Sequence, residues 1–259
     1  VDSCAMAMQK IAAAYRRALD VKVVGITGSV GKTSTKEMIA SVLSQKYNVL
    51  KTEGNFNNEI GLPLTIFKIR EEHEVAVLEM GISHFDEMHR LAEMAQPDIM
   101  VITNIGLCHL ENLITRDGIL KAKTESFEHL AEDGMVILNG DDDKLATVSE
   151  VNGRKPVFYG IGAVSDGSME HGSIGNKREI FAENVRTVGL ESTECTVHLG
   201  KEVFSVTLPL AGVHNVYNAL AAAAVARELG LTVEEMKRGM ETVKTIGGRS
   251  NLIEKDGMT

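Results

Sequence analysis

The sequence predicts an α/β fold in which helices flank a mostly parallel β-sheet. From residue 21 to residue 159, short apolar runs alternate with segments whose apolar residues recur at helical spacing. Apolar strands separated by helices indicate a parallel sheet that is covered on both faces. Between Glu179 and Leu208 the pattern changes to three β-rich runs, with turn residues at Gly189 and Gly200. These runs predict a small antiparallel sheet inserted near residues 179–208.

The predicted elements follow one another in a regular order. An alanine-rich helix leads into the first strand, and the later strands are apolar runs that alternate with helices. Two more helices follow the antiparallel strands, and the glycine-rich stretch at 160–175 predicts a long surface loop. The expected strands of the parallel sheet are 21–27, 48–52, 75–79, 98–103, 135–138 and 157–159, and the expected helices are 3–19, 33–46, 86–95, 117–130, 215–229 and 233–243.

The composition is that of a soluble globular protein. Of the 259 residues, 44% are hydrophobic and 24% are charged, which is enough to bury a substantial core. The net charge of −9 argues against nucleic-acid and membrane-surface partners, because these favour a basic face. No segment has the pattern of a membrane span or a secretion signal, and the three cysteines lack C-x-x-C spacing. We therefore expect a cytoplasmic protein without disulfides.

The stretch VVGITGSVGKTSTKEM combines an apolar strand, a glycine-containing loop and a helix start. The glycines let backbone N–H groups fold around a polyphosphate, and the helix adds its positive end. In such a loop Lys32 would reach the β and γ phosphates, and Thr33 would hold Mg²⁺. The pattern departs from G-x-x-x-x-G-K-[ST] because Ile26 stands at the first glycine position. The alternative is a plain glycine turn. The predicted nucleotide-binding residues are Gly28, Ser29, Val30, Gly31, Lys32, Thr33 and Ser34.

Two further side chains follow the ends of predicted strands. Glu79 ends the apolar run VAVLE, and His109 comes shortly after the strand at 98–103. Ligands of open parallel sheets bind at the carboxyl ends of the strands, so both side chains would share an edge with Lys32. The alternatives are that Glu79 caps a neighbouring loop and that His109 is a structural hydrogen-bonding residue.

Lys123 occupies an unusual position in the helix expected at 117–130. It completes the apolar stripe formed by Ile119, Phe127 and Leu130. A buried ammonium group is unfavourable unless it is paired or its charge is changed. One interpretation is that Lys123 snorkels from the edge of the stripe. The other is that Lys123 joins Lys32, Glu79 and His109 in one site.

Over nearly its whole length the chain resembles the Mur ligases, which are ATP-dependent amide-forming enzymes of bacterial cell-wall synthesis. The resemblance implies a P-loop-type central ATP-binding domain at residues 21–245. It also implies that residues 1–20 are a helical connector from a missing N-terminal domain, and that residues 246–259 are a hinge and the start of a truncated C-terminal domain. The motifs that carry it are TGSVGKTSTKE, LEMG at 78–81, TNIGLCHLE at 103–111, AK at 122–123, LNGDD at 138–142 and GVHNVYNALAAAAVA at 212–226.

The resemblance also implies roles for individual residues. In these ligases the lysine that matches Lys123 reacts with CO₂ to form a carbamate, and this anion helps to hold a second Mg²⁺. The implied metal ligands are Thr33, Glu79, His109 and carbamylated Lys123, and the implied catalytic residues are Lys32, His109 and Lys123. The implied nucleotide contacts outside the loop are Asn139, Asn215, Asn218 and Arg249. The alternatives are that the Asn residues at 215 and 218 cap a helix and that Arg249 is a solvated hinge residue.

The stretch TEGNFNNEIGLPLTIF at 52–67 resembles the branch of the family that adds D-alanyl-D-alanine. In that branch Asn55, Asn57 and Asn58 would line the site for the peptide-bearing nucleotide sugar, because amides suit hydrogen bonding to peptide and sugar. The alternative is a cluster of turn residues.

The implied reaction starts when the carboxylate of UDP-MurNAc-tripeptide attacks the γ-phosphate of ATP. The amine of D-Ala-D-Ala then displaces phosphate from the resulting acyl phosphate. The alternatives are another Mur or folylpolyglutamate-type ligase and a P-loop NTPase that performs no ligation. We expect a monomer, and we expect residues 1–259 alone to bind nucleotide weakly or not at all and to catalyse no ligation.

Overall fold

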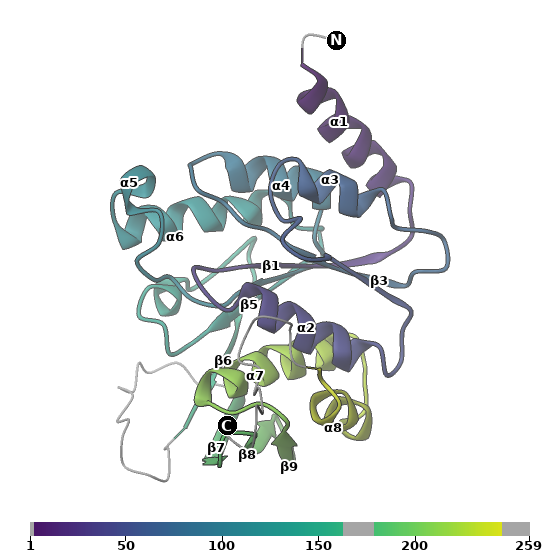
Figure 1. Cartoon of the computed structure of the whole chain (residues 1–259). Coiled ribbons are helices and arrows are strands. Elements are labelled where there is room, and N and C mark those ends of the chain that lie inside the picture. The colour runs from purple at the N-terminus through teal and green to yellow at the C-terminus, as the bar shows by residue number, and fades with distance from the viewer. Residues whose placement is uncertain (1–2, 163–178, 245–259) are drawn as a thin grey trace, which may run out of the picture.

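The computed structural model of the chain describes residues 3–162 and 179–244, and it has one sheet with helices on both faces (Figure 1). The strands are β1 (Lys22–Thr27), β2 (Val49–Lys51), β3 (Val75–Glu79), β4 (Ile99–Ile102), β5 (Met135–Asn139), β6 (Val157–Ile161), β7 (Ile180–Val188), β8 (Ser192–Leu199) and β9 (Glu202–Leu208). Their order in the sheet is β2-β3-β1-β4-β5-β6-β7-β8-β9. Neighbours are parallel from β2 to β7, which confirms the predicted α/β class with a mostly parallel sheet.

The helices cover two separate cores. They are α1 (Cys4–Arg17), α2 (Lys32–Leu43), α3 (Gly61–Ile66), α4 (Glu87–Ala95), α5 (Leu110–Leu113), α6 (Arg116–Thr124), α7 (Val213–Glu228) and α8 (Val233–Glu241), with 3₁₀ helices η1 (Glu125–His129) and η2 (Leu145–Thr147). Successive strand residues point to opposite faces, so Val77 joins the core under α2, α7 and α8 while Leu78 joins the core under α3, α4 and α6. Figure 1 shows these two helical layers above and below the sheet.

The three β-rich runs form β7, β8 and β9, and their pairing is antiparallel as expected. They do not form a separate sheet but extend the parallel one, because β7 pairs in parallel with β6. This pairing begins with Tyr159 opposite Ile180. Gly189 and Gly200 form the predicted turns, with φ of 60° and 65°, values that glycine adopts without steric cost. β6 continues to Ile161, and from residue 163 on the loop expected at 160–175 lies outside the described residues. The hinge expected within residues 246–259 also lies outside them.

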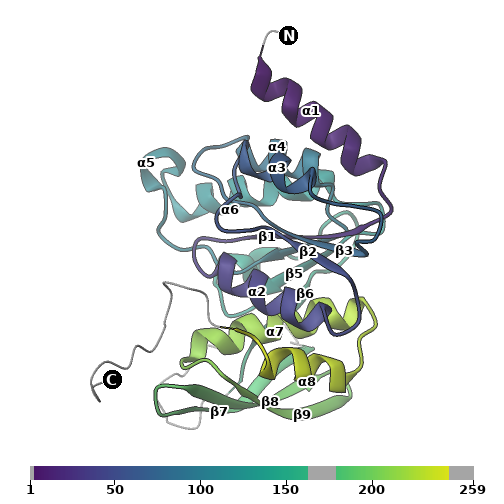
Figure 2. The same ribbon diagram turned by 45° about the vertical axis from the view of Figure 1, so that its right-hand side comes forward.

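α7 is buried on every side. Each residue from Asn218 to Ala226 is buried, because the helix contacts α2, α8 and the strands from β5 to β8. Figure 2 shows α7 and α8 between α2 and the strands β7–β9. The many alanines allow this close approach, since a small side chain leaves room for neighbours on all faces. Among the described residues no helix has both the length and the apolarity needed to cross a membrane.

The prediction of a single helix at 117–130 is wrong for the second half of this range. α6 ends at Thr124, and residues 125–129 form the 3₁₀ helix η1. The Thr124 hydroxyl donates to the carbonyl oxygens of Leu120 and Lys121, and the Ser126 hydroxyl donates to the carbonyl oxygen of Lys123 at 2.9 Å. Hydroxyl groups that bond to the preceding turn compete with the α-helical backbone ladder. The backbone therefore changes from an α-helix to the tighter 3₁₀ helix just after Lys123.

Two short helices, α3 and α5, are missing from the predicted elements. α3 follows a stretch rich in asparagine, and Asn58 Oδ1 accepts hydrogen bonds from the N–H groups of Ile60 and Gly61 at its start. α5 has only four residues. Helices of this length contain too few repeats for their apolar period to be recognised.

We expect Gly239→Ala to lower the free energy of unfolding by roughly 1–3 kcal/mol. A Cβ at Gly239 in α8 would lie 2.4 Å from Val42 Cα in α2, so the two helices would have to separate. Chemical denaturation measures the change. Arg238→Ala, at the exposed neighbouring position, is the control and should change the stability by less than about 0.5 kcal/mol. Equal effects of the two substitutions would contradict the close helix contact.

Candidate active site

The carboxyl ends of four parallel strands meet at one edge of the sheet. The register places Glu79 of β3 beside Ile26 of β1, and Ile102 of β4 beside Thr27. The same Ile102 pairs with Leu138 of β5. The segments that follow these strands therefore emerge side by side, and they contain most of the predicted site residues.

The phosphate loop, residues 28–31, is fastened to the end of β4. Gly28 has a φ of 150°, and a Cβ at this position would lie 1.9 Å from Thr103 Oγ1. The N–H of Ser29 donates to the carbonyl oxygen of Asn104, and the N–H of Val30 donates to Asn104 Oδ1, both at 3.0 Å. Gly28 is therefore required by close packing and by its backbone angle.

α2 begins at Lys32, directly after the phosphate loop. Lys32 Nζ donates to the carbonyl oxygen of Gly28 at 2.9 Å, so the ammonium lies over the loop. Thr33 and Ser34 follow in the first helical turn and are half-buried. The N–H groups of a helix start and a nearby ammonium create a positive potential, which suits an anionic phosphate.

A pocket of about 580 Å³ lies beside the phosphate loop and is lined by Asn139 and Asn218 among others. The Thr35 hydroxyl donates to Asn218 Oδ1 at 2.8 Å, and Asn218 Nδ2 donates to Asn215 Oδ1 at 3.2 Å. Asn215 is buried and supports Asn218, and it is not among the residues that line the pocket. Asn218 thus lines the pocket while Asn215 lies behind it, and the sequence did not distinguish these two positions.

Several residues of this pocket were not predicted. The Tyr217 hydroxyl donates to Asp141 Oδ2 at 3.0 Å, which joins α7 to the segment after β5. Both side chains lie within motifs that the sequence had already singled out, LNGDD and GVHNVYN, so only the individual residues were missed. The remaining lining residues without a predicted role are Thr35, Thr103, Asn104, Asp142, Tyr159 and His214.

Glu79 is buried at the end of β3, with only 2% of its surface exposed. Its Oε1 accepts a hydrogen bond from Asn57 Nδ2 at 2.8 Å, and its Oε2 lies 3.8 Å from the ammonium of Lys36, which is also buried. Within the described residues Oε2 has no hydrogen-bond donor although it is buried. A buried carboxylate oxygen without a donor is a natural ligand for a cation. Lys36 was not predicted, although it lies within the quoted motif TGSVGKTSTKE.

The three asparagines predicted to bind substrate have different positions. Asn57 contacts Glu79, so the structure gives it a role in orienting that carboxylate. Asn58 is exposed and holds the start of α3, while Asn55 is exposed. The hydrogen bonds of Asn58 are thus those of a turn residue, as in the alternative interpretation of this stretch.

The segment that leads to His109 packs on the phosphate loop. The N–H of Gly106 donates to Ser29 Oγ at 2.8 Å, and Cys108 Sγ lies 3.1 Å from the same oxygen. His109 itself is exposed and has a φ of 52° at the start of α5. Its backbone position is therefore coupled to the phosphate loop, while its imidazole faces outward from the core.

Lys123 does not snorkel, because only 1% of its surface is exposed. Burial first, and then the positive charge of Lys32, lower the pKa of Lys123 to about 8. Within residues 3–162 and 179–244 no carboxylate forms an ion pair with this ammonium. The structure therefore brings Lys123 near Lys32 in an environment that favours the neutral amine. Arg249 lies outside the described residues.

The family model of the Mur ligase middle domain matches residues 26–226. The chain belongs to the Mur ligase family and contains its middle domain. It is 40% identical, over 99% of its length, to the UDP-N-acetylmuramoyl-tripeptide–D-alanyl-D-alanine ligase of Bacillus subtilis (strain 168), of which it covers 52%.

Solved structures of related proteins have the same fold. The crystal structure of MurF from Acinetobacter baumannii matches 99% of this chain and 53% of its own, with a TM-score of 0.87 and 34% identity. MurF from Thermotoga maritima in complex with ADP matches 99% of this chain and 56% of its own, with a TM-score of 0.85 and 31% identity. The chain thus spans about half the length of the relatives it matches.

We expect Lys123→Met to raise the free energy of unfolding by roughly 1–3 kcal/mol at pH 7 in buffer depleted of CO₂. The folded protein binds the Lys123 proton less tightly than the unfolded chain does, with a pKa of about 8 against 10.5. The gain should be complete below pH 8 and should shrink as the pH rises from about 8 to 10.5. Denaturation at several pH values measures it.

Lys121→Met is the matched control, since Lys121 lies exposed on the same helix. Its stability should follow that of the wild type at every pH. A Lys123→Met protein that is less stable than the wild type at pH 7 would contradict the unfavourable burial of this charge.

Proposed function

We propose that this chain is the ATP-binding middle domain of a ligase that adds D-Ala-D-Ala to UDP-MurNAc-tripeptide in peptidoglycan precursor synthesis. The observation that carries the proposal is the sheet edge with a phosphate loop and the buried carboxylate of Glu79, near which the buried Lys123 feels the charge of Lys32. The preference for D-Ala-D-Ala is supported by the similarity to the Bacillus subtilis relative, which is a UDP-N-acetylmuramoyl-tripeptide–D-alanyl-D-alanine ligase. On this proposal the domain extends over residues 21–245, with residues 1–20 as a connector and residues 246–259 as a hinge.

In this proposal the chain acts mainly by positioning and by charge neutralisation. The phosphate loop and Lys32 bind the β and γ phosphates of ATP, while Asn139 and Asn218 line the nucleotide pocket. The substrate carboxylate attacks the γ-phosphorus, ADP leaves, and an acyl phosphate forms. The amine of D-Ala-D-Ala then attacks the acyl carbon, and inorganic phosphate leaves as the amide forms.

The residues present fit a divalent cation. Glu79 offers a buried oxygen without a donor, Thr33 offers a hydroxyl at the helix start, and Asn57 fixes the carboxylate. Two Mg²⁺ ions would neutralise charge on the phosphates: Thr33 would hold the nucleotide-bound ion, Glu79 and His109 would also serve as Mg²⁺ ligands, and the carbamate of Lys123 would help to hold the second ion. The carbamate forms when the neutral amine of Lys123 attacks CO₂ and releases a proton, and the lowered pKa of Lys123 favours this amine.

Phosphate release tests the proposed reaction. The natural full-length sequence that contains residues 1–259 is supplied with ATP, Mg²⁺ and UDP-MurNAc-tripeptide. We expect phosphate release that depends on D-Ala-D-Ala and not on single amino acids or glutamate. Lys32→Ala should reduce turnover by at least about 100-fold with an unchanged circular dichroism spectrum, because it removes charge stabilisation at the transferred phosphoryl group.

The other outcomes separate the alternatives. Release that depends on another amine would identify a different Mur or folylpolyglutamate-type ligase. Release that is indifferent to both substrates would identify a P-loop NTPase without ligation. Near-normal turnover of Lys32→Ala would remove Lys32 from the mechanism. We propose that the ligase is cytoplasmic, because ATP and the nucleotide-linked precursor are cytoplasmic. We propose also that it is a monomer.

We expect Lys123→Ala to abolish ligation and a small carboxylate such as acetate to restore part of it. The acetate would supply the anion that the carbamate provides, in the space vacated by the side chain. Lys121→Ala should keep full activity with or without acetate. Full activity of Lys123→Ala, or a complete lack of rescue, would contradict the carbamate role.

A further inference from the structure

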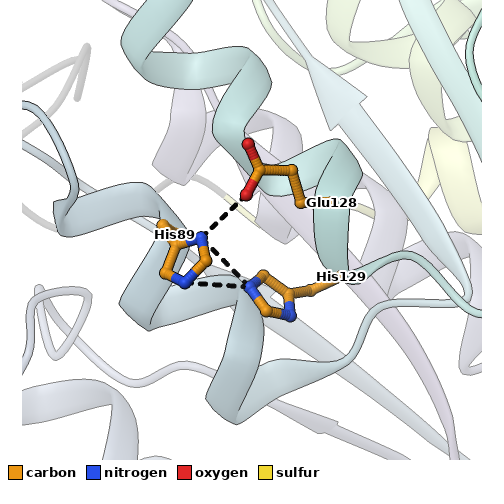
Figure 3. A group of neighbouring side chains, drawn as sticks. All are labelled: His89, Glu128 and His129. Atoms are coloured by element: carbon orange, nitrogen blue, oxygen red, sulfur yellow. Dashed lines mark hydrogen bonds and ion pairs between the residues drawn. The ribbon is translucent and has the colours of Figure 1, made fainter.

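A compact group of metal-binding side chains lies outside the proposed active site. His89 comes from α4, and Glu128 and His129 come from η1 (Figure 3). His89 Nδ1 lies 2.9 Å from Glu128 Oε2 and 3.2 Å from His129 Nε2. Among the described residues, one ligand atom from each of these three side chains lies within 4.8 Å of the other two.

The backbone around this group is held independently of the three side chains. α4 begins after Asp86, which has a φ of 64° and no side-chain cap of its own. Instead, the carboxylate of Glu125 in η1 accepts hydrogen bonds from the N–H groups of Asp86 and His89, at 3.1 and 3.4 Å. Glu125 thus caps α4 from the neighbouring element and fixes η1 against it. The two elements that supply the ligands are therefore already in place.

Two of the distances within the group are close to those of a tetrahedral metal site, and the third is within 4.8 Å. With metal–ligand bonds of about 2.0–2.1 Å, neighbouring ligand atoms in a tetrahedral zinc site are about 3.3 Å apart. The two distances from His89 Nδ1 are close to this value. Two imidazoles and one carboxylate are a donor set that zinc accepts, with a remaining position for water. Mg²⁺ and Ca²⁺ prefer oxygen ligands, so this set discriminates against them.

We infer that His89, Glu128 and His129 form a binding site for a zinc-class divalent cation. The bound ion would connect α4, which follows the strand of Glu79, to η1, which continues directly from the helix of Lys123. It would therefore fix the relative position of two elements that lead away from the proposed active site. The site is partly exposed, with 43% of the His89 side chain and 61% of the Glu128 side chain accessible, so an ion can enter without unfolding.

Calorimetric titration with ZnCl₂ tests this inference on the tag-free chain of residues 1–259 at pH 7.5. We expect one zinc ion to bind per chain in the presence of excess Mg²⁺. His89→Ala and Glu128→Gln should each weaken this binding at least tenfold. His109→Ala should leave it unchanged, which separates this site from the proposed Mg²⁺ ligands. His84→Ala is the matched control, because His84 is an exposed histidine just before α4 that lies outside the group.

Thermal unfolding provides a second measurement. Zinc should raise the unfolding midpoint of the wild type and of His84→Ala, because it binds the folded pair of elements, and it should not raise that of Glu128→Gln. Glu128→Gln changes an exposed side chain without changing its size, so we expect this variant to fold. It therefore tests the site even if His89→Ala does not fold. The absence of a zinc ion in the wild type, or equal loss of binding in His84→Ala and Glu128→Gln, would overturn the inference. Either result would leave His89 and His129 as a hydrogen-bonded pair.

Discussion

The site depends on the contact between Gly28 and Thr103. The chain leaves β1 and must cross the end of β4, and a side chain at Gly28 would overlap Thr103 Oγ1. Because glycine permits the crossing, the next two N–H groups reach Asn104, and Ser29 Oγ accepts from Gly106. One close packing contact thus fixes the phosphate loop, the start of α2 and the segment that leads to His109.

Three charged side chains are buried around the candidate site, although apolar side chains in their place would be more stable. Glu79 and Lys36 are both buried and lie 3.8 Å apart, with Asn57 as a hydrogen-bond donor to Glu79. Lys123 is buried without an acidic partner among the described residues. Such groups lower the stability of a fold unless they are paired or bind a ligand. Glu79 and Lys36 form such a pair, whereas Lys123 does not, and under the proposed function its burial serves the reaction.

The sheet completes the pocket beside the phosphate loop through the helix it positions. β7, β8 and β9 extend the parallel sheet and, with β5 and β6, surround α7. This brings Asn218 at the start of α7 into hydrogen-bond contact with Thr35 of α2, although many residues separate them in the sequence. The antiparallel strands therefore influence the site through the position of α7, without contributing a side chain to the pocket.

The sequence by itself determined the α/β class, the phosphate loop and the strand-end position of Glu79, because apolar periodicity and glycine placement are local properties. It did not determine that Asn57 holds Glu79, that Lys36 is its neighbour, that Asn215 lies beneath Asn218 or that η1 interrupts the helix after Lys123. These depend on contacts between distant segments and on hydroxyl groups that compete with the backbone. The group of His89, Glu128 and His129 forms only because α4 packs on η1. Such a contact between segments far apart in the chain cannot be read from a local sequence pattern.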